Sequence, residues 1–341
     1  MVWIIGILAV VFVLLFLFAC LCMYVSFGKR CEGNPHLKYF TADDFDGLEA
    51  EPVEFMSDKG QILRGYIYTR NEISDPIGLV VFAHGMGGGH LSYTTEINTF
   101  AASGFKVLAY DNTGTMASDG EKLGSFYQSA RDLQYALKFV QSNKKLSKYK
   151  IVLAGHSWGG YAVCQTVTKE NVSGAVVLSA PNSTAKVIGD GAKAMAGFSL
   201  SWLRPFLYLA SIVFGGWSAR NTCAAILMKT KDVPILLLQG DKDTSVVMKN
   251  SPVYYDKIRN KENITAIIYN GKAHNVYQTR QSEEYLAKRF SAINAAKIKY
   301  GKAEIPEDEK ERLYAIDYKL ITQEDPEVMK TITDFMKDCV K

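Results

Sequence analysis

The stretch that decides the fold is KIVLAGHSWGGYAV, residues 150–163. It begins with apolar residues typical of a buried strand and continues, after a glycine-rich turn, in a pattern typical of a helix. Gly155 and Gly159 lie two residues before and two residues after Ser157. A strand that turns sharply into a helix leaves no room for side chains beside the turn, so the two glycines predict that Ser157 Oγ projects from its apex. We therefore predict that Ser157 is a nucleophile, with a chance occurrence of this short pattern as the alternative.

Short apolar runs recur along the chain and are separated mostly by segments of helical length. They cover residues 78–83, 105–110, 151–154, 174–179, 234–238 and 264–269. Before them, residues 51–69 contain two alternating apolar runs around a Ser-Asp-Lys-Gly turn, which predicts a β-hairpin. Strands buried on both faces and joined by helices predict an α/β fold, with a mostly parallel central sheet and helices on both faces. Ligands bind beyond the carboxyl ends of such strands, so functional residues are expected directly after these runs.

Two backbone N–H groups are candidates to stabilise the oxyanion that forms when a serine attacks a carbonyl. The N–H of Trp158 opens the helix after Ser157, where unsatisfied donors and the helix dipole favour negative charge. The glycine-rich stretch HGMGGG, residues 84–89, follows the first parallel run and offers the N–H of Met86. The sequence therefore predicts an oxyanion hole formed by Met86 and Trp158.

A histidine is needed to take the serine proton, and the chain has five, at positions 36, 84, 90, 156 and 274. His274 follows the last apolar run in a short turn and is the predicted general base. His156 is expected to pack beneath the turn of the nucleophile, and His84 and His90 to brace the glycine-rich loop. No HExxH or comparable ligand spacing occurs in the sequence, so no metal site is predicted.

An acidic residue should fix the tautomer of this histidine, and two aspartates follow the run at 234–238. We prefer Asp243, because the pattern Gly-x-x-Asp-x-x-Val at residues 240–246 places it in the turn, before a hydrophobic anchor. Asp241 is expected to be a solvated turn residue, and the reversed assignment is the alternative. The predicted catalytic residues are thus Ser157, Asp243 and His274, a set that requires no cofactor.

The order Ser157, Asp243, His274, together with the motifs GHSWGG, HGMGGG and GDKDTSVV, resembles the α/β-hydrolase superfamily. Within it, the sequence is most similar to the branch of lipases, esterases and serine-aminopeptidase-like enzymes. The resemblance covers about residues 50–280 and the final helix near 326–340. It implies an α/β-hydrolase fold and acyl transfer through an acyl-enzyme.

One loop departs from the pattern of that branch. After the second parallel strand the branch usually has Asp-x-Arg-Gly, whereas this chain reads Asp111-Asn112-Thr113-Gly114. Thr113 therefore stands in the place of the usual arginine, which leaves the subfamily open.

The first part of the chain has the properties of a membrane anchor. Residues 2–27 carry no charge, and at about 1.5 Å per residue they exceed a hydrocarbon core of about 30 Å. A cleaved signal peptide is the alternative, but no basic residue precedes the apolar run and no small-x-small cleavage site ends it. Because Lys29, Arg30 and Lys38 follow the span, the positive-inside rule favours a cytoplasmic position for the rest of the chain.

The composition of the whole 341-residue chain limits the classes of function that fit it. Hydrophobic content of 48% and charged content of 22% match an ordinary enzyme, and a net charge of +4 is too small to indicate nucleic-acid binding. Six scattered cysteines predict free thiols. We expect a transmembrane anchor at residues 1–28, a linker at 29–50 and one hydrolase domain at 51–341. The expected partners are a small-molecule ester or lipid substrate and the membrane.

The connection between the fourth and fifth parallel runs, at about residues 183–232, is longer than a crossover needs and predicts a helical cap over the site. Its middle, residues 195–217, is apolar with one charge, Arg204. One interpretation is an acyl-chain pocket or a lipid-facing surface, with Trp202, Phe206 and Phe214 as substrate-binding residues. The alternative is that these side chains pack against the core and say nothing about the substrate.

The sequence thus predicts a membrane-anchored serine hydrolase that cleaves carboxylic esters of lipid-like or other apolar acids. A peptidase or amidase with the same machinery is one alternative, and a binding protein that kept the fold without catalysis is another. Helices near residues 281–299 and 307–320, and a final helix from Asp325-Pro326, are expected to pack on the sheet or to serve a partner.

Overall fold

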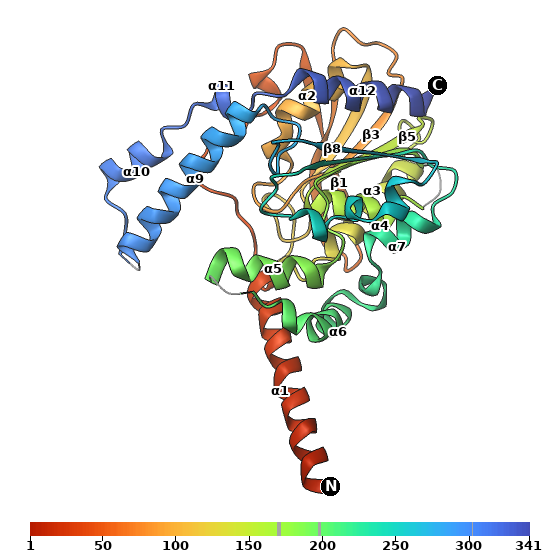
Figure 1. Cartoon of the computed structure of the whole chain (residues 1–341). Helices are drawn as coiled ribbons and strands as arrows, with labels where there is room; N and C mark the ends of the chain where they lie inside the picture. Colours follow the sequence, from red (N-terminus) through yellow and green to blue (C-terminus); the bar gives the residue numbers. More distant parts are fainter. Residues whose placement is uncertain (169–171, 197–198, 302) are drawn as a thin grey trace.

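The computed structural model describes residues 1–168, 172–196, 199–301 and 303–341, and in this part of the chain eight strands form one sheet (Figure 1). The strands are β1 (Leu48–Met56), β2 (Ile62–Arg70), β3 (Gly78–Ala83), β4 (Phe105–Tyr110), β5 (Ile151–His156), β6 (Val172–Leu178), β7 (Ile235–Gly240) and β8 (Ile264–Tyr269). Their order is β1-β2-β4-β3-β5-β6-β7-β8. The β1–β2 hairpin pairs antiparallel with β4, and the other neighbouring pairs are parallel. The predicted hairpin and the mostly parallel sheet are confirmed.

The parallel register aligns the strand ends that carry the predicted chemistry. Every residue of β3, β5 and β7 is buried, which explains their uninterrupted apolar character. Ala83 at the end of β3 pairs with Gly155 of β5. The loops after these strands therefore emerge side by side at one edge of the sheet.

Helices cover both faces of the sheet, as predicted (Figure 1). On one face, α2 (Thr94–Ala102) and α12 (Pro326–Val340) share a hydrophobic core with alternate residues of the central strands. On the other face lie α3 (Gln128–Ser142), α4 (Trp158–Thr166) and α8 (Asp256–Arg259). Short 3₁₀ helices occur in the connections: η1 (Ala42–Asp44), η2 (His90–Tyr93), η3 (Ser201–Leu203), η4 (Trp217–Arg220), η5 (Met248–Asn250) and η6 (Pro252–Tyr254).

Between β6 and β7 the chain forms the helical insertion that the sequence predicts. It contains α5 (Thr184–Ala196), α6 (Arg204–Gly215) and α7 (Cys223–Lys229), while residues 197–198 lie outside the described part. Pro205 stands in the first turn of α6, where its missing N–H costs no helical hydrogen bond. It therefore begins the second cap helix.

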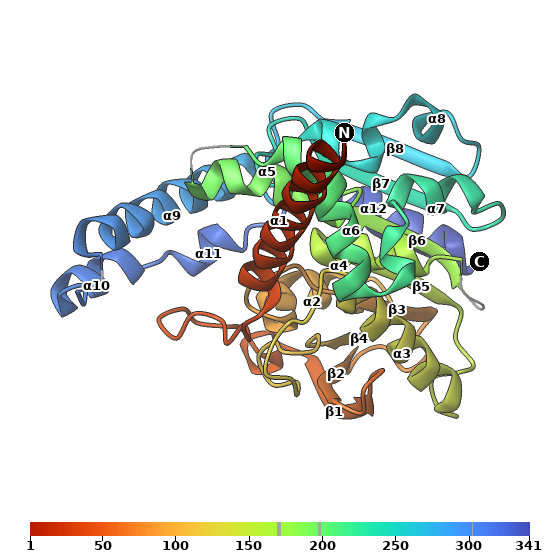
Figure 2. The ribbon, with the colours of Figure 1, turned by 90° about the horizontal axis from the view of Figure 1, so that it is seen from below.

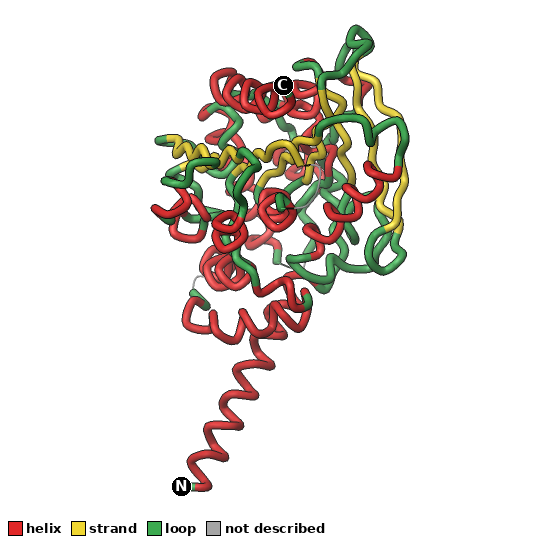
Figure 3. The backbone as a smooth tube through the Cα atoms, turned by 90° about the vertical axis from the view of Figure 1, so that its right-hand side faces the viewer, coloured by secondary structure: helices red, strands yellow, loops and turns green. Residues whose placement is uncertain are grey.

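The apolar N-terminal segment is one helix, α1 (Val2–Phe27). Its N-terminal end projects away from all other elements (Figure 3), its middle packs on α6, and Ala19, Met23 and Phe27 are buried in the hydrophobic core. Among the described residues it is the one helix long and apolar enough to cross a membrane.

The C-terminal part departs from one expectation. The last helix, α12, packs on the sheet as expected, but α9 (Arg280–Tyr300) and α10 (Glu307–Tyr314) extend away from it (Figures 1 and 2). They join through a small cluster of their own around Ile293 and Leu313, and the short α11 (Tyr318–Ile321) leads back to the domain. The prediction that these helices pack on the sheet is wrong for α9 and α10, whose buried residues Ile293, Ala296 and Leu313 form a separate cluster.

Candidate active site

The predicted nucleophile lies at a sharp turn between β5 and α4. Ser157 has φ 54° and ψ −113°, a left-handed backbone that costs energy for a residue with a side chain. A Cβ on Gly159 would lie 1.9 Å from the carbonyl oxygen of Ala83, and one on Gly155 would lie 2.5 Å from that of Gly159. The two glycines thus let the turn press against β3. The N–H of Ser157 donates to the carbonyl of Leu178, 2.8 Å away, and holds the turn against β6.

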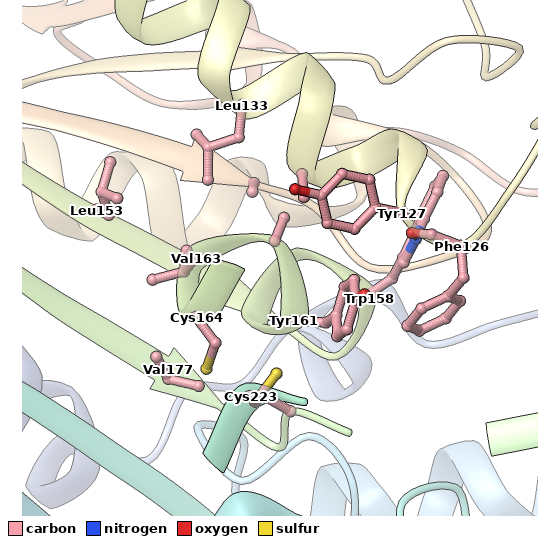
Figure 4. Close-up of a cluster of buried hydrophobic side chains, with 14 of the residues drawn as sticks. Phe126, Tyr127, Leu133, Leu153, Trp158, Tyr161, Val163, Cys164, Val177 and Cys223 are labelled. Atoms are coloured by element: carbon pink, nitrogen blue, oxygen red, sulfur yellow. The ribbon is translucent and has the colours of Figure 1, made fainter. Parts of the chain in front are cut away.

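Aromatic packing fixes the first turn of α4 behind the nucleophile (Figure 4). Trp158 is buried, and its Nε1–H donates to the carbonyl of Phe126 at 2.7 Å. The ring of Phe126 also packs on Tyr161, with ring centroids 4.8 Å apart. Because three bulky side chains interlock there, the peptide N–H of Trp158 has a fixed position beside Ser157.

The structure brings His274 and Asp243 into contact. Asp243 follows β7, and its Oδ2 lies 2.8 Å from His274 Nδ1. Gln239 Nε2 donates to the same oxygen at 2.8 Å, and Oδ1 accepts the N–H groups of Ser245 and Val246, each at 2.8 Å. These bonds fix the carboxylate, and its contact with Nδ1 leaves Nε2 of His274 for proton exchange with a nucleophile.

Asp241, the alternative acid, has a different environment. Its Oδ1 accepts the N–H of Gly271 at 2.6 Å and so closes the turn between β7 and the loop after β8. The contact with His274 is made by Asp243. The geometry therefore favours the preferred assignment over the reversed one.

A chain of hydrogen bonds links the glycine-rich loop to His274. The N–H of Gly85 donates to the hydroxyl of Tyr93 at 3.0 Å, and this hydroxyl lies 2.9 Å from His156 Nδ1. His156 Nε2 lies 3.0 Å from the carbonyl of His274, and the two rings are 4.7 Å apart. Burial, and secondly the neighbouring His274, hold the pKa of His156 well below its usual value. A neutral ring that accepts from Tyr93 and donates to the carbonyl of His274 satisfies both nitrogens, and it ties the backbone of His274 to the residue that precedes Ser157.

His84 and His90 hold the loop after β3, the bracing position expected of them. His84 Nδ1 lies 2.6 Å from the carbonyl of Gly85, and Nε2 accepts the N–H of Asn112 at 2.9 Å. Burial lowers the pKa of His84, in agreement with a neutral ring that donates at one nitrogen and accepts at the other. Asp111 Oδ1 contacts both the N–H and the Nδ1 of His90, at 2.9 and 2.7 Å. Met86 belongs to this braced loop, which follows β3. Trp158 follows β5, which is the neighbour of β3 in the sheet, so the two predicted N–H donors come after neighbouring strands.

A pocket of about 450 Å³ opens beside the loop that carries Met86. One wall consists of Met86 together with Asn275 and Tyr277, which directly follow His274. The opposite wall comes from residues 37–40 and from α9, whose Leu286 and Phe290 face the pocket. Its lining is mainly apolar and aromatic but includes the charged side chains of Lys38 and Glu96, and neither Ser157 nor His274 is among the lining residues.

The sequence offered no signal for this pocket or for Tyr93. The pocket combines residues 37–40 with residues 286–290, about 250 positions later in the chain, and the residues involved have no distinctive spacing. Tyr93 is an ordinary aromatic residue in a short 3₁₀ helix, η2, and only its hydroxyl contacts show its position in the network.

The three side chains predicted to bind substrate lie on the cap and do not line this pocket. Trp202 is 60% exposed, while Phe206 and Phe214 are partly buried against the core. The ring of Phe206 packs on Phe12 of α1, with centroids 5.2 Å apart. The structure therefore brings Ser157 and His274 to one edge of the sheet and places Phe206 against the N-terminal helix.

The chain directly after α1 is tied to the loop that follows β4. Arg30 donates to the carbonyls of Ser118 and Gly120 at 2.7 and 2.8 Å, and Cys31 forms a parallel bridge with Thr115. Cys31 Sγ also donates to the carbonyl of Gly87 at 2.6 Å. These contacts fasten the start of the expected linker to the loops that frame the site.

No metal-binding cluster is present in the described ranges, where no three His, Cys, Asp or Glu side chains are grouped to hold an ion. The cysteines are free thiols, and Cys164 and Cys223 are buried beside α4 and α7 (Figure 4).

Comparisons with known proteins agree with this architecture. A model of the serine aminopeptidase family, S33, matches residues 74–212. The quorum-quenching protein AidA of Acinetobacter baumannii is 27% identical over 135 residues, which is 38% of this chain and 44% of AidA. The acylamino-acid-releasing enzyme of Sus scrofa is 27% identical over 196 residues, 52% of this chain and 26% of that enzyme. The chain thus matches less than half the length of either relative.

A solved structure extends the likeness to most of the chain. The esterase Pf2001 of Pyrococcus furiosus superposes with a TM-score of 0.58 at 20% sequence identity, covering 80% of this chain and 98% of the esterase. At this identity the superposition shows that the two proteins share a fold, including the mostly parallel sheet with its surrounding helices.

Proposed function

We propose that this chain, which has an α/β-hydrolase fold, is a membrane-anchored serine hydrolase that cleaves carboxylic esters of apolar acids. The observation that carries the proposal is the 2.8 Å contact between His274 Nδ1 and Asp243, on a histidine linked through His156 to the turn of Ser157. A histidine held by a carboxylate near a strained, partly buried serine is the arrangement that activates a hydroxyl for acyl transfer.

In the proposed reaction Ser157 Oγ attacks the ester carbonyl and its proton passes to His274 Nε2. Asp243 holds the imidazole in the tautomer that accepts this proton and stabilises the resulting cation. The N–H groups of Met86 and Trp158 bind the oxyanion of the tetrahedral intermediate. The protonated His274 then gives its proton to the leaving alcohol, and water hydrolyses the acyl-enzyme by the same steps in reverse order.

Two observations support an ester with an apolar part as the substrate. The pocket beside Met86, which adjoins the site although Ser157 and His274 do not line it, has mainly apolar and aromatic side chains, among them Leu37, Tyr277 and Phe290. The solved structure that shares the fold over most of this chain is described as an esterase.

A peptide or amide substrate is the second candidate. The family model that matches residues 74–212 describes serine aminopeptidases, and one relative is an acylamino-acid-releasing enzyme. The same acyl-enzyme chemistry serves esters and amides, so the choice depends on the pocket and on the leaving group.

Membrane anchoring by α1 is supported by the way this helix packs. Ala19, Met23 and Phe27 are buried against the domain, and the ring of Phe27 lies 5.8 Å from that of Phe126. Removal of α1 as a signal peptide would expose this apolar surface of the domain. Retention as an anchor keeps it covered, and the basic residues after α1 favour a cytoplasmic domain.

The proposal is tested with the full chain in lipid nanodiscs. We expect hydrolysis of a chain-length series of p-nitrophenyl esters, with low activity on aminoacyl p-nitroanilides. Ser157→Ala should abolish ester hydrolysis, while Ser142→Ala, at an exposed position of α3, should leave it unchanged. A strong preference for the anilides would select the amidase function, and ester hydrolysis that survives Ser157→Ala would refute the proposed nucleophile.

A further inference from the structure

The cap helix α6 lies against the middle of α1, on the side of the domain from which α1 projects (Figures 1 and 2). Their contact includes the ring pair of Phe206 and Phe12. After Arg204 at its start, α6 contains no charged residue, and the next charge along the chain is Arg220. An uncharged cap helix thus lies alongside an uncharged helix that is long enough to span a bilayer.

The length of α1 places this contact inside a membrane. From Val2 to Phe12, α1 advances by about 15 Å, whereas a hydrocarbon core is about 30 Å thick. The part of α1 that extends beyond α6 therefore covers only about half of that thickness. If α1 crosses the whole core, the segment that packs on α6 lies within the hydrocarbon or at its boundary.

The outer face of α6 is apolar as well as its inner face. Leu207 and Ala210 are buried in the core, and this burial explains why the inner face of α6 is apolar. On the outer face, Tyr208 and Leu209 are 40% and 39% exposed, and Val213 is 66% exposed. A helix that only covers a core has polar residues on its outer face, so burial of the inner face does not explain this composition.

The two ends of α6 carry the residues that favour the membrane–water interface. Trp202, just before the helix, is 60% exposed, and Trp217, just after it, is 69% exposed. Tryptophan concentrates at the level of the lipid headgroups. Arg204 is paired with Asp190 at 2.9 Å, and the guanidinium of Arg220 lies 4.1 Å from the ring centre of Trp217. Both cations at the ends of α6 therefore have partners at this level.

We propose that α6, with Trp202 and Trp217 at its ends, is embedded in the lipid leaflet nearest to the domain and lies parallel to the membrane plane. The occupant of its outer face is the hydrocarbon of that leaflet. Because α6 belongs to the cap, the enzyme meets lipid at its active-site side and takes amphiphilic esters with a long acyl chain from the bilayer. The statement about substrate rests on the proposed hydrolase function, whereas the embedding of α6 requires only that α1 is inserted.

The embedding is tested by fluorescence quenching in nanodiscs that contain lipids brominated in the acyl chain. The full chain carries tryptophan at positions 3, 158, 202 and 217. In a background in which Trp3, Trp202 and Trp217 are replaced by Phe, the remaining Trp158 is buried in the protein. A probe is then introduced by Val213→Trp on α6.

The matched control is Ile77→Trp in the same background, at an exposed aliphatic residue before β3, at the end of the sheet opposite the site. Brominated lipid should quench the Val213→Trp probe at least about threefold more than the control probe. A separate variant that keeps Trp3 as its probe reports insertion of α1. Quenching of Trp3 together with equal, weak quenching of the Val213 and Ile77 probes would overturn the proposal.

An activity measurement tests the substrate statement separately. Val213→Asp places a charge on the lipid-facing side, and Ile77→Asp places the same charge on the far side. For a long-chain ester in the nanodisc, Val213→Asp should lower kcat/KM about tenfold, while hydrolysis of water-soluble p-nitrophenyl acetate changes less than about twofold. Equal loss on both esters would refute uptake from the bilayer. Because quenching requires no turnover, an inactive wild type would contradict the hydrolase function and leave the embedding to be judged by the probes.

Discussion

At the scale of single residues, the position of His274 depends on groups that the nucleophile motif does not name. The carboxylate of Asp243 contacts Nδ1 of His274, and the side-chain amide of Gln239 donates a hydrogen bond to the same carboxylate oxygen. His156 bonds to the backbone of His274 and, through Tyr93, to the loop that carries the predicted oxyanion donor. We infer that this network fixes the position of His274, the proposed base, relative to the loop that carries the predicted oxyanion donor Met86.

Replacement of Tyr93 by Phe tests the network. It removes the hydroxyl that joins Gly85 N–H to His156 and leaves the ring in place. We expect kcat to fall about fivefold to tenfold, as for loss of one buried hydrogen bond, with KM almost unchanged. Steady-state kinetics on one ester measure this. A change confined to KM would show that Tyr93 serves binding of the ground state instead.

Replacement of each candidate aspartate by Asn distinguishes their roles. Asp243→Asn should lower kcat by about 10⁴-fold, because an amide favours the wrong tautomer of His274. Asp241→Asn should lower kcat less than about threefold, since Asp241 accepts a turn N–H and a side-chain amide oxygen can accept the same bond. The reverse order of effects would assign the catalytic acid to Asp241.

At the scale of elements, the sequence predicts most of what the structure contains, because the decisive patterns are local. Uninterrupted apolar runs indicate β3, β5 and β7, and glycine at two positions indicates the turn between β5 and α4. Contacts between distant segments leave no such pattern. The pocket beside Met86, the position of α6 against α1 and the projecting pair α9–α10 each depend on contacts between distant segments, so the structure was needed to find them.

The nucleophile turn gives a prediction on stability. Gly159→Ala should lower the free energy of unfolding by about 3 kcal/mol, the upper end for overpacking, because its Cβ would meet the carbonyl of Ala83. The control is Gly191→Ala in α5, where a Cβ meets no described atom within 4 Å. This change should leave stability equal or raise it by about 0.5–1 kcal/mol. Thermal unfolding of both variants measures the difference, and equal stability would contradict the close approach of the turn to β3.

A buried pair of carboxyl groups between α2 and α12 gives a prediction on pH. Burial raises the pKa of Glu324 to about 7, and burial followed by the charge of Glu324 raises the pKa of Glu96. Thr99 donates to Glu324 at 2.5 Å. Between about pH 4.5 and 7 the folded state keeps a proton that the unfolded chain has released, so stability falls as pH rises through this window, by up to about 1.4 kcal/mol per pH unit.

Glu324→Gln keeps the acceptor for Thr99 and removes the titration. Its midpoint temperature of unfolding should change less between pH 5 and pH 7.5 than that of the wild type. Glu327→Gln, at an exposed position of α12, is the control and should follow the wild type. An unchanged pH dependence in Glu324→Gln would show that this carboxyl is ionised in the folded protein across the window.

At the scale of the whole molecule, the helix α1 and the α/β domain form one packed unit. One face of the second half of α1 is buried against the domain, Arg30 fastens the following residues to the loop after β4, and the cap lies beside α1. The domain therefore has a fixed orientation relative to α1, with the carboxyl ends of the parallel strands toward the cap. The charge pattern around α1 bears only on the side of the membrane, whereas this packing decides which face of the domain would meet the lipid if α1 is inserted as proposed.

The most direct test of the central claim is the site of reaction with a fluorophosphonate, which traps an activated serine. The full chain in nanodiscs is incubated with the reagent, digested and mapped by mass spectrometry. We predict one adduct, on the peptide that contains Ser157, which is absent in Ser157→Ala and forms far more slowly in Asp243→Asn. A folded wild type that gains no adduct, or one that gains it equally after Ser157→Ala, would contradict the claim.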